Sequence, residues 1–479
     1  MATAWAGAPL YPECLLAVLI LVIIVVDALF WPRRPSGNLG YLTLCGLLLV
    51  LSTALEEWTY GTGGTAFHDL VFLDTYATFF DILVLAAALC ALLLALSRTN
   101  GQKPRGEFYP LLLLAVLGMM LTAAAADLII VYLGLEMASL PLWALAALGR
   151  RDDAGVEAGL KFLLLGLFGS GMALFGTALL YGAVGSTGLQ ALVESLSSSA
   201  ADSVLVAPGV VLLLAGLLLK AGAAPLHAWS PDVREGCPLP VSAFVAMAVP
   251  AAALAALGRV LLYGLAPVGD LWMPLVEAAA VLSMVGGSLL ALNQRNIRRL
   301  LAYVGVAQVG CALVGLLAVN EAGLAALLFW WVGLALALAG CYAVLAICGP
   351  ESPSLRDYWG LGRRQPLLAL SLALCLASLA GLPPTAGFVG RFYLLTAALE
   401  AGHKGLALVV AGCFPLLLYA CMRVIIGAFL RAPSADPPAV RLGAESLVVL
   451  LLSVLGTLGL GLMPSALLRA ARETVVAVL

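Results

Sequence analysis

Ionisable side chains inside apolar segments are the residues of this chain best suited to chemistry. Lys220 lies in the apolar run that begins the stretch 212–244, and four prolines follow it, the first of them Pro225. A charge in hydrocarbon is costly, and proline removes a backbone donor and breaks a helix. Both costs in one segment predict a broken helix whose freed backbone groups and charge line an enclosed polar cavity. The alternative is a lysine near a helix end that extends its amine to the membrane interface.

An acid and a second lysine lie in the two apolar segments before this one. Glu136 is nine residues after Asp127, about 13 Å along a helix, which places its carboxyl near the middle of a bilayer. Lys161 lies about 10 Å into its own segment. We expect Glu136, Lys161 and Lys220 to form one buried cluster.

The residue types in this cluster predict proton transfer. Only four of the 24 basic residues are lysines, and two of those four, Lys161 and Lys220, lie inside apolar segments. A buried lysine can lose its proton near neutral pH, whereas arginine stays charged in proteins. The alternative is a static ion pair that only fixes how the helices pack.

The composition indicates a membrane protein. The chain has 479 residues, of which 63% are apolar and 10% are charged, whereas soluble proteins have about 25% charged residues. Apolar runs of about 20 residues, each long enough to span a bilayer, recur along the whole chain. We therefore expect one all-α polytopic bundle. Fourteen spans are predicted near residues 11–31, 39–56, 73–97, 108–126, 127–149, 154–183, 204–224, 239–263, 271–292, 298–319, 321–348, 366–400, 405–430 and 442–463.

A second break is predicted in the twelfth span, where Pro383 and Pro384 interrupt the apolar run and Arg391 follows. The seventh and twelfth spans thus both carry a charge beside a break. Because they are five spans apart, spans 4–8 and 9–13 are expected to form two inverted five-helix repeats. The chain is then a single transmembrane domain, with helices 1–3 in 1–107, the first repeat in 108–263, the second repeat in 271–430 and helix 14 in 431–479.

The basic residues of the loops predict the orientation in the membrane. Loops after odd-numbered spans hold 16 Lys and Arg residues, whereas the even-numbered loops and both termini hold three. Positively charged loops stay on the cytoplasmic side, so both termini are expected outside. One missed or additional span would destroy this alternation, which therefore supports the count of 14.

The sequence argues against several kinds of site. The ten cysteines are scattered singly with no C-x-x-C pair, which favours buried small side chains over disulfides or metal ligands. His68, His227 and His403 are the three histidines, and they are far apart, so a two-histidine haem site is not expected. The chain has no dinucleotide or flavin fingerprint, and its net charge of -2 does not suggest nucleic acid as a partner.

Five segments carry a family resemblance. They are LGLEMASLPLWAL at 133–145, LKFLLLGLFGSG at 160–171, KAGAAPLHAWSPD at 220–232, NQRNIRRLLAYVGVAQVG at 293–310 and GLPPTAGFVGRFY at 381–393. Together they resemble the antiporter-like membrane subunits of respiratory complex I and, among these, the subunit N family. The resemblance extends from Tyr11 through the last span.

This resemblance implies a proton-translocating membrane-arm subunit of an NADH:quinone oxidoreductase, with a proton path along a polar axis at mid-membrane. Glu136, Lys161 and Lys220 match the family's glutamate of span 5 and lysines of spans 6 and 7. In this family, the glutamate and the span-7 lysine are thought to act as a coupled pair.

The resemblance also implies the surroundings of the chain. NADH, flavin, iron–sulfur clusters and quinone would be bound by partner subunits, which include sister antiporter-like subunits. This chain would do no redox chemistry and would hold no cofactor or metal. The expected location is a bacterial inner membrane, with both termini on the periplasmic side.

The chain departs from the family pattern in its second half. Pro250 stands where the family usually has a lysine, Arg391 also replaces a lysine, and Gln308 stands where histidine is frequent. Proline carries no proton and arginine releases none, so Arg391 could act as a barrier or an electrostatic gate. Pro250 should also loosen its helix. His227, Tyr303 and Gln308 are the candidate relay residues across this gap.

Two other functions stay open at this point. The chain could belong to a multisubunit cation/proton antiporter or a membrane-bound hydrogenase, which share the fold. It could also be a structural subunit that no longer pumps. The changes at Pro250 and Arg391 favour a structural role, whereas the retained Glu136, Lys161 and Lys220 oppose it.

Overall fold

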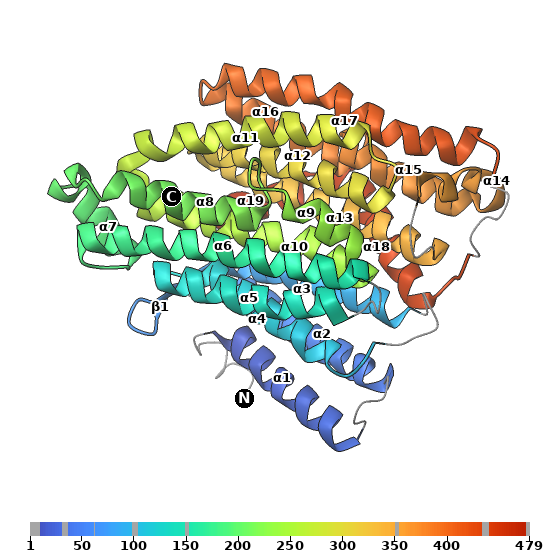
Figure 1. Cartoon of the computed structure of the whole chain (residues 1–479), viewed down its shortest axis with the longest axis horizontal. Coiled ribbons are helices and arrows are strands. Elements are labelled where there is room, and N and C mark those ends of the chain that lie inside the picture. The colour runs from blue at the N-terminus through green and yellow to red at the C-terminus, as the bar shows by residue number, and fades with distance from the viewer. Residues whose placement is uncertain are drawn as a thin grey trace.

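The computed structural model describes residues 10–30, 37–61, 63–97, 104–148, 153–349, 354–433 and 440–475, and this part of the chain is almost entirely helical. The helices lie side by side in one bundle, with α1 at one edge and α17 at the other (Figure 1). Their bounds are α1 (Tyr11–Phe30), α2 (Gly37–Tyr60), α3 (Thr75–Leu96), α4 (Phe108–Ala124), α5 (Leu128–Leu148), α6 (Asp153–Val184), α7 (Leu189–Leu196), α8 (Val206–Ala221), α9 (Trp229–Gly236), α10 (Leu239–Gly258), α11 (Gly269–Leu292), α12 (Ile297–Leu317), α13 (Glu321–Cys348), α14 (Leu361–Arg364), α15 (Pro366–Ala380), α16 (Ala386–Glu400), α17 (Lys404–Leu430), α18 (Ala444–Leu462) and α19 (Ser465–Val475).

Short segments between the α-helices take other regular conformations. A π-helical segment, Arg259–Gly264, extends α10, and 3₁₀ turns occupy Ser199–Asp202, Ala266–Val268 and Leu355–Tyr358. The expectation of a purely α-helical chain needs one correction. An antiparallel hairpin of β1 (Gly64–Ala66) and β2 (Val71–Leu73) precedes α3, with Thr65 opposite Phe72. Its turn takes a positive φ at Phe67, His68 and Asp69, and this turn with the β-forming Val71 and Phe72 suits a hairpin better than the start of a span.

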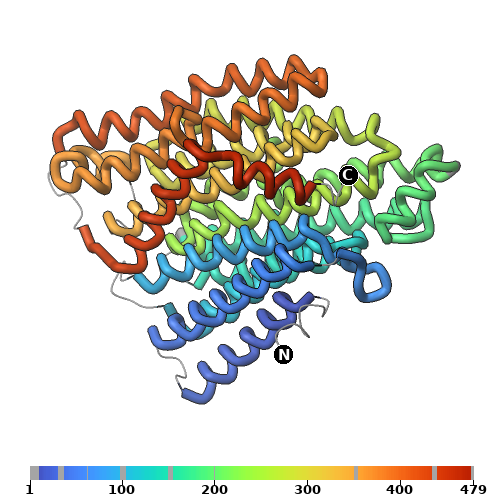
Figure 2. Tube along the Cα trace, turned by 180° about the vertical axis from the view of Figure 1, so that it is seen from behind, coloured from blue at the N-terminus to red at the C-terminus, as the bar shows by residue number. Residues whose placement is uncertain are grey.

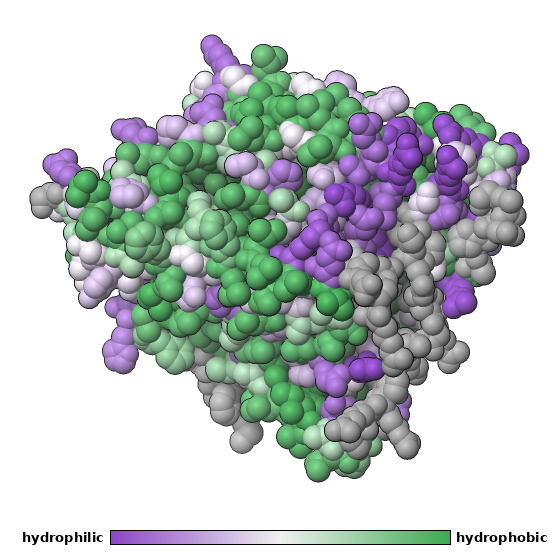
Figure 3. All heavy atoms as spheres, viewed as in Figure 1, coloured by the Kyte–Doolittle hydropathy of each residue, from purple (hydrophilic) through white to green (hydrophobic). Residues whose placement is uncertain are grey.

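The helices are those of a polytopic membrane protein. Eleven of the described helices are long and apolar enough to cross a membrane, and α4, α8 and α15 are shorter apolar helices. Figure 3 shows hydrophobic residues over most of the described surface on this face, with hydrophilic residues gathered toward the α14 end. On the opposite face, α19 turns back from α18 across the bundle and packs against α13 and α3 (Figure 2).

Both predicted helix interruptions are confirmed. α8 ends before Gly222, whose φ is +74°, and α9 begins at Trp229. The second break runs from Gly381, with φ +88°, to Ala386 at the start of α16. Glycine takes this left-handed conformation without the steric cost of a side chain, and the prolines that follow prevent the helix from resuming.

Glycines bring the helices of the first half into close contact. A Cβ atom added to Gly118 of α4 would lie 2.4 Å from the backbone nitrogen of Ala138 in α5. One added to Gly216 of α8 would lie 2.5 Å from the carbonyl oxygen of Gly169 in α6. Small residues allow membrane helices to approach in this way. As a result, polar side chains of α5, α6 and α8 meet one another directly.

Candidate functional site

Lys220 and Glu136 form a buried ion pair at the first break. Lys220 lies in the last turn of α8, and its Nζ donates to Glu136 Oε1 of α5 at 2.9 Å and to Ser139 Oγ at 2.9 Å. The Lys220 side chain is only 8% exposed. An amine extended to the membrane interface is therefore excluded.

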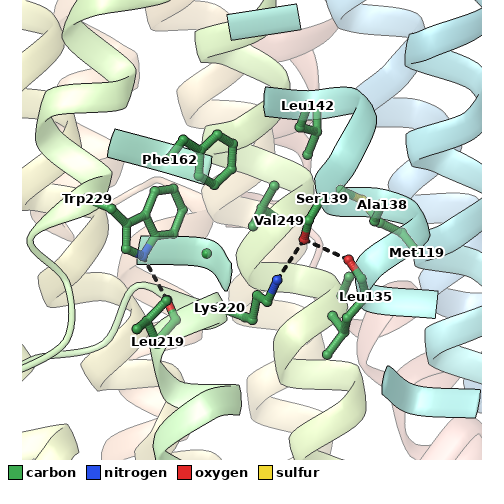
Figure 4. A pocket seen from close by; sticks show the side chains of 12 residues that line it. Met119, Leu135, Ala138, Ser139, Leu142, Phe162, Leu219, Lys220, Trp229 and Val249 are labelled. Carbon is green, nitrogen blue, oxygen red and sulfur yellow. Dashed lines mark hydrogen bonds between the residues drawn. The ribbon is translucent and has the colours of Figure 1, made fainter. Parts of the chain in front are cut away.

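Further polar and aromatic groups surround the amine. Figure 4 shows the Lys220 amine directed at the Ser139 hydroxyl, which in turn donates to the carbonyl of Leu135 at 2.7 Å. The centre of the Trp143 ring lies 5.6 Å from Lys220 Nζ, close enough for a cation–π contact. The carboxyl end of α8 adds its negative partial charge. A lysine amine has three donors, so one donor remains for a water molecule.

Lys161 is not in contact with this pair, so the expectation of one buried cluster of three residues is wrong. Its Nζ donates to Asp232 at 2.8 Å and lies 2.7 Å from Glu157, and its side chain is 41% exposed. The α6 residue that reaches Glu136 is Ser170. Nine residues, or two and a half helical turns, separate the two positions, so they lie on opposite sides of α6.

Lys161 belongs instead to an ionic network around α9. Asp232 pairs with both Lys161 and Arg299, the latter at 2.9 Å, and Arg299 also pairs with Glu235 at 2.9 Å. Arg299 lies on α12, so α9 connects α6 with a helix of the second half. Because each charge has several partners, this network should contribute more to stability than an isolated exposed ion pair does.

The three candidate relay residues are not joined to one another: Tyr303 and Gln308 lie on α12, and His227 lies between α8 and α9. The ring centroids of His227 and Tyr303 are 6.4 Å apart, and Arg299 lies over the Tyr303 ring at 5.9 Å. Gln308 is fully buried, and its Nε2 donates to the carbonyl of Leu379 at 2.6 Å. Within the described ranges, no hydrogen bond connects His227, Tyr303 and Gln308.

Arg391 lies beyond the second break and contacts the end of α15. Its Nη1 donates to the carbonyl of Ala380 at 2.6 Å, and its guanidinium lies 5.5 Å and 5.6 Å from the rings of Trp330 and Phe414. Its Nε and Nη2 have no partner among the described residues. A cation at the carboxyl end of a helix is favourable, so α15 compensates part of this charge.

Pro250 does not interrupt its helix. α10 runs without interruption through Pro250, which is buried. Three residues earlier, the carbonyl of Met247 accepts a hydrogen bond from Trp331 Nε1 of α13 at 3.0 Å. Neighbouring helices commonly satisfy backbone groups near a proline in membrane helices, and here α13 holds the segment in place.

A second buried ion pair, between Arg259 and Asp74, is absent from the sequence prediction. The guanidinium makes two bonds to the carboxylate, at 2.6 and 2.5 Å, and lies 4.8 and 4.6 Å from the rings of Phe72 and Tyr76. Arg259 Nε also donates to the carbonyl of Ala123 at 3.2 Å. The pair therefore connects the start of α3 with the ends of α4 and α10.

The described residues also bear on metal binding, which requires a set of ligand side chains. Among the described residues, no group of three or more His, Cys, Asp or Glu side chains could hold a metal ion. The candidate site is the Glu136–Lys220 pair with its two serines.

The fold and the site define a class, the antiporter-like membrane proteins. Residues 125–415 match the family described as "NADH:quinone oxidoreductase/Mrp antiporter, TM". A chain of the Mrp complex from Dietzia sp. has the same fold, with a TM-score of 0.86 over 98% of this chain and 97% of its own, at 22% sequence identity.

Relatives with higher sequence identity to this chain define its family within this class. "NADH-quinone oxidoreductase subunit N" of Trichlorobacter lovleyi is 36% identical over 97% of this chain and 96% of its own length, and that of Chloroflexus aggregans is 36% identical over 95% and 94%. A chain of respiratory complex I from Thermus thermophilus is 33% identical, with a TM-score of 0.84 over 97% of this chain and 100% of its own. The chain belongs to the subunit N family of NADH-quinone oxidoreductase, the antiporter-like membrane subunits of complex I.

Proposed function

We propose that this chain is a proton-translocating membrane-arm subunit of a complex I-type NADH:quinone oxidoreductase and does no redox chemistry of its own. The observation that carries the proposal is the buried Glu136–Lys220 pair beside a broken helix. A lysine and a carboxylate in contact can exchange a proton, and ionisable residues within a membrane are functional by default. NADH, flavin, iron–sulfur clusters and quinone belong to partner subunits in this proposal.

The orientation in the membrane follows from the helices and the loop charges. Eleven long helices and the three shorter helices α4, α8 and α15 correspond to 14 spans. With basic loops inside, both termini lie on the periplasmic side of a bacterial inner membrane. Six of the 16 basic loop residues, Arg33, Arg34, Arg98, Lys103, Arg150 and Arg151, lie outside the described residues, as do the terminal segments 1–9 and 476–479.

Two repeats account for the two breaks. We assign α4–α10 to the first repeat, within 108–263, and α11–α17 to the second, expected over 271–430 although α11 begins at Gly269. Helices α1–α3, within 1–107, and α18 with α19, within 431–479, flank them. The whole chain is one transmembrane domain in this proposal.

Isolation of the intact complex tests the proposal against its main rival, a subunit of a cation/proton antiporter or hydrogenase. An affinity tag on this chain should recover an NADH:quinone oxidoreductase that pumps protons into liposomes. Recovery of an assembly that exchanges sodium for protons without oxidising NADH would favour the antiporter. Recovery of an assembly that evolves hydrogen would favour the hydrogenase.

The ionic network around α9 predicts a modest role for Lys161. Lys161→Met in the assembled complex should lower proton pumping less than Lys220→Met does, because Arg299 remains paired with Asp232. NADH-driven acidification of liposomes measures both variants. Equal losses in the two variants would contradict this assignment.

Arg391 is predicted to act as a fixed charge rather than a proton carrier. Arg391→Lys keeps the positive charge at the end of α15 and adds a group that can release a proton. We expect an assembled complex with an unchanged number of protons pumped per electron. A raised number would mean that a missing carrier has been restored, which contradicts a fixed charge.

A further inference from the structure

The Glu136–Lys220 pair lies between two small cavities, both lined by Lys220. The inner cavity is lined mainly by residues that follow Glu136 on α5 or precede Ser170 on α6, such as Ser139 and Phe162. Trp229 of α9 and residues of α4, α8 and α10 complete its wall. Its volume is about 20 Å³, room for about one water molecule. In the proposed orientation it lies on the cytoplasmic side of the pair.

The outer cavity lies on the other side of the pair, among α5, α6 and α8. It is lined by residues that precede Glu136 on α5 and follow Ser170 on α6, including Tyr132, Ala173 and Thr177. Its volume is about 10 Å³, close to the space that one water molecule needs. Polar side chains therefore accompany the route from Glu136 toward the periplasmic ends of these helices.

Ser170 can hydrogen-bond Glu136 in either protonation state. Its hydroxyl is buried and has two acceptors within reach, the Glu136 carboxylate and the carbonyl of Gly166 at 2.8 Å. A hydroxyl has one hydrogen to donate. Ser170 can donate to the ionised carboxylate, or it can accept from the protonated carboxyl and donate to Gly166. Neither state of Glu136 leaves a buried group without a partner.

We propose that Glu136 releases protons through the outer cavity, past Ser170 and Thr177, so that the first repeat contains its own outward exit. This inference rests on the proposed function. The Lys220 ammonium first passes a proton to the Glu136 carboxylate, leaving a neutral amine and a neutral carboxyl. The carboxyl gives its proton to Ser170, which releases its own hydrogen to water in the outer cavity. Lys220 then takes a proton from water in the inner cavity, so one proton has crossed and both groups are restored.

The outer end of this route has a suitable acceptor. Asp127 precedes α5, and its Oδ2 accepts a hydrogen bond from Thr187 at 2.7 Å while its Oδ1 accepts from the backbone of Ile129 at 2.7 Å. Leu128, the next residue, lines the outer cavity. An exit here also needs no proton carrier at Pro250 or Arg391, since proline carries no proton and arginine releases none.

A matched pair of variants tests the exit in the intact complex in liposomes. Ala173→Val adds two methyl groups to the wall of the outer cavity without changing any charge or hydrogen bond. Ala178→Val is the control, because Ala178 is exposed on the surface of the same helix. The ratio of protons pumped to electrons should fall as much in Ala173→Val as in Glu136→Gln, and should stay native in Ala178→Val.

The outcomes separate the exit from the proposed function. A reduced ratio in Glu136→Gln with a native ratio in Ala173→Val would overturn the exit and leave the proposed function standing. A native ratio in Glu136→Gln would overturn the proposed function itself.

A second variant keeps the test decisive if Ala173→Val does not assemble. Ser170→Ala should also lower the ratio as much as Glu136→Gln. Its control is Ser453→Ala, since Ser453 is equally buried and also donates to the carbonyl four residues back, that of Val449, at 2.7 Å. A native ratio in Ser170→Ala would show that Ser170 only bonds its own helix, and would overturn the exit.

Discussion

A complex that carries Lys220→Met should assemble but pump fewer protons per electron than the native complex. Methionine has nearly the volume of lysine and suits a buried apolar site, so packing should survive. Without the amine, Glu136 has no ammonium at 2.9 Å from which to take a proton. Proton uptake by liposomes, measured against NADH oxidation, gives the ratio.

Lys220→Arg distinguishes charge from proton transfer at the same position. Arginine keeps the positive charge but does not release its proton, so pumping should fall here as well. Lys404→Met is the matched control, because Lys404 is exposed at the start of α17. Native pumping in both Lys220 variants, in an assembled complex, would make the residue structural.

Removal of Asp74 should have the largest effect on stability. Arg259 is 2% exposed, and Asp74→Ala would leave its guanidinium buried without a carboxylate. Breaking a buried pair in this way costs about 3–5 kcal/mol. The measurement is the thermal unfolding of the purified complex in detergent, with the exposed Asp270→Ala as control.

A double variant checks the cause of that loss. In Asp74→Ala/Arg259→Met no unpaired charge remains, so stability should recover partly relative to Asp74→Ala alone. If the stability losses of the two single variants simply added up in the double variant, the loss in Asp74→Ala would not come from an unpaired Arg259.

Much of the fold was predictable from the sequence, because hydropathy and proline placement report directly on membrane helices. The break after Lys220 and the break after Ala380 both lie where the prolines predict them. The short hairpin before α3 was not predictable from hydropathy, since Val71–Leu73 is as apolar as the span that follows it.

The candidate site was predictable only in part. The contact between Glu136 and Lys220 follows from their depth in the membrane, but depth does not tell which side of a helix a residue occupies. Helical periodicity could have placed Lys161 opposite Ser170 on α6. It would then have identified the serine as the neighbour of Glu136.

The Arg259–Asp74 pair was missed for another reason. Asp74 precedes α3 and also accepts a hydrogen bond from the backbone of Ala77 at 2.9 Å, so in the sequence it resembles an ordinary helix cap. Its partner is 185 residues away in the chain. Only the packing of α3 against α10 brings the two together.

The most direct measurement for the central claim, that protons pass through Glu136 and Lys220, is the number of protons pumped per electron by a complex carrying Glu136→Gln. Glutamine keeps the size of the side chain and an oxygen for Lys220 but cannot take up a proton. With electron transfer retained and assembly intact, a reduced number of protons per electron is predicted. An unchanged number would contradict the claim.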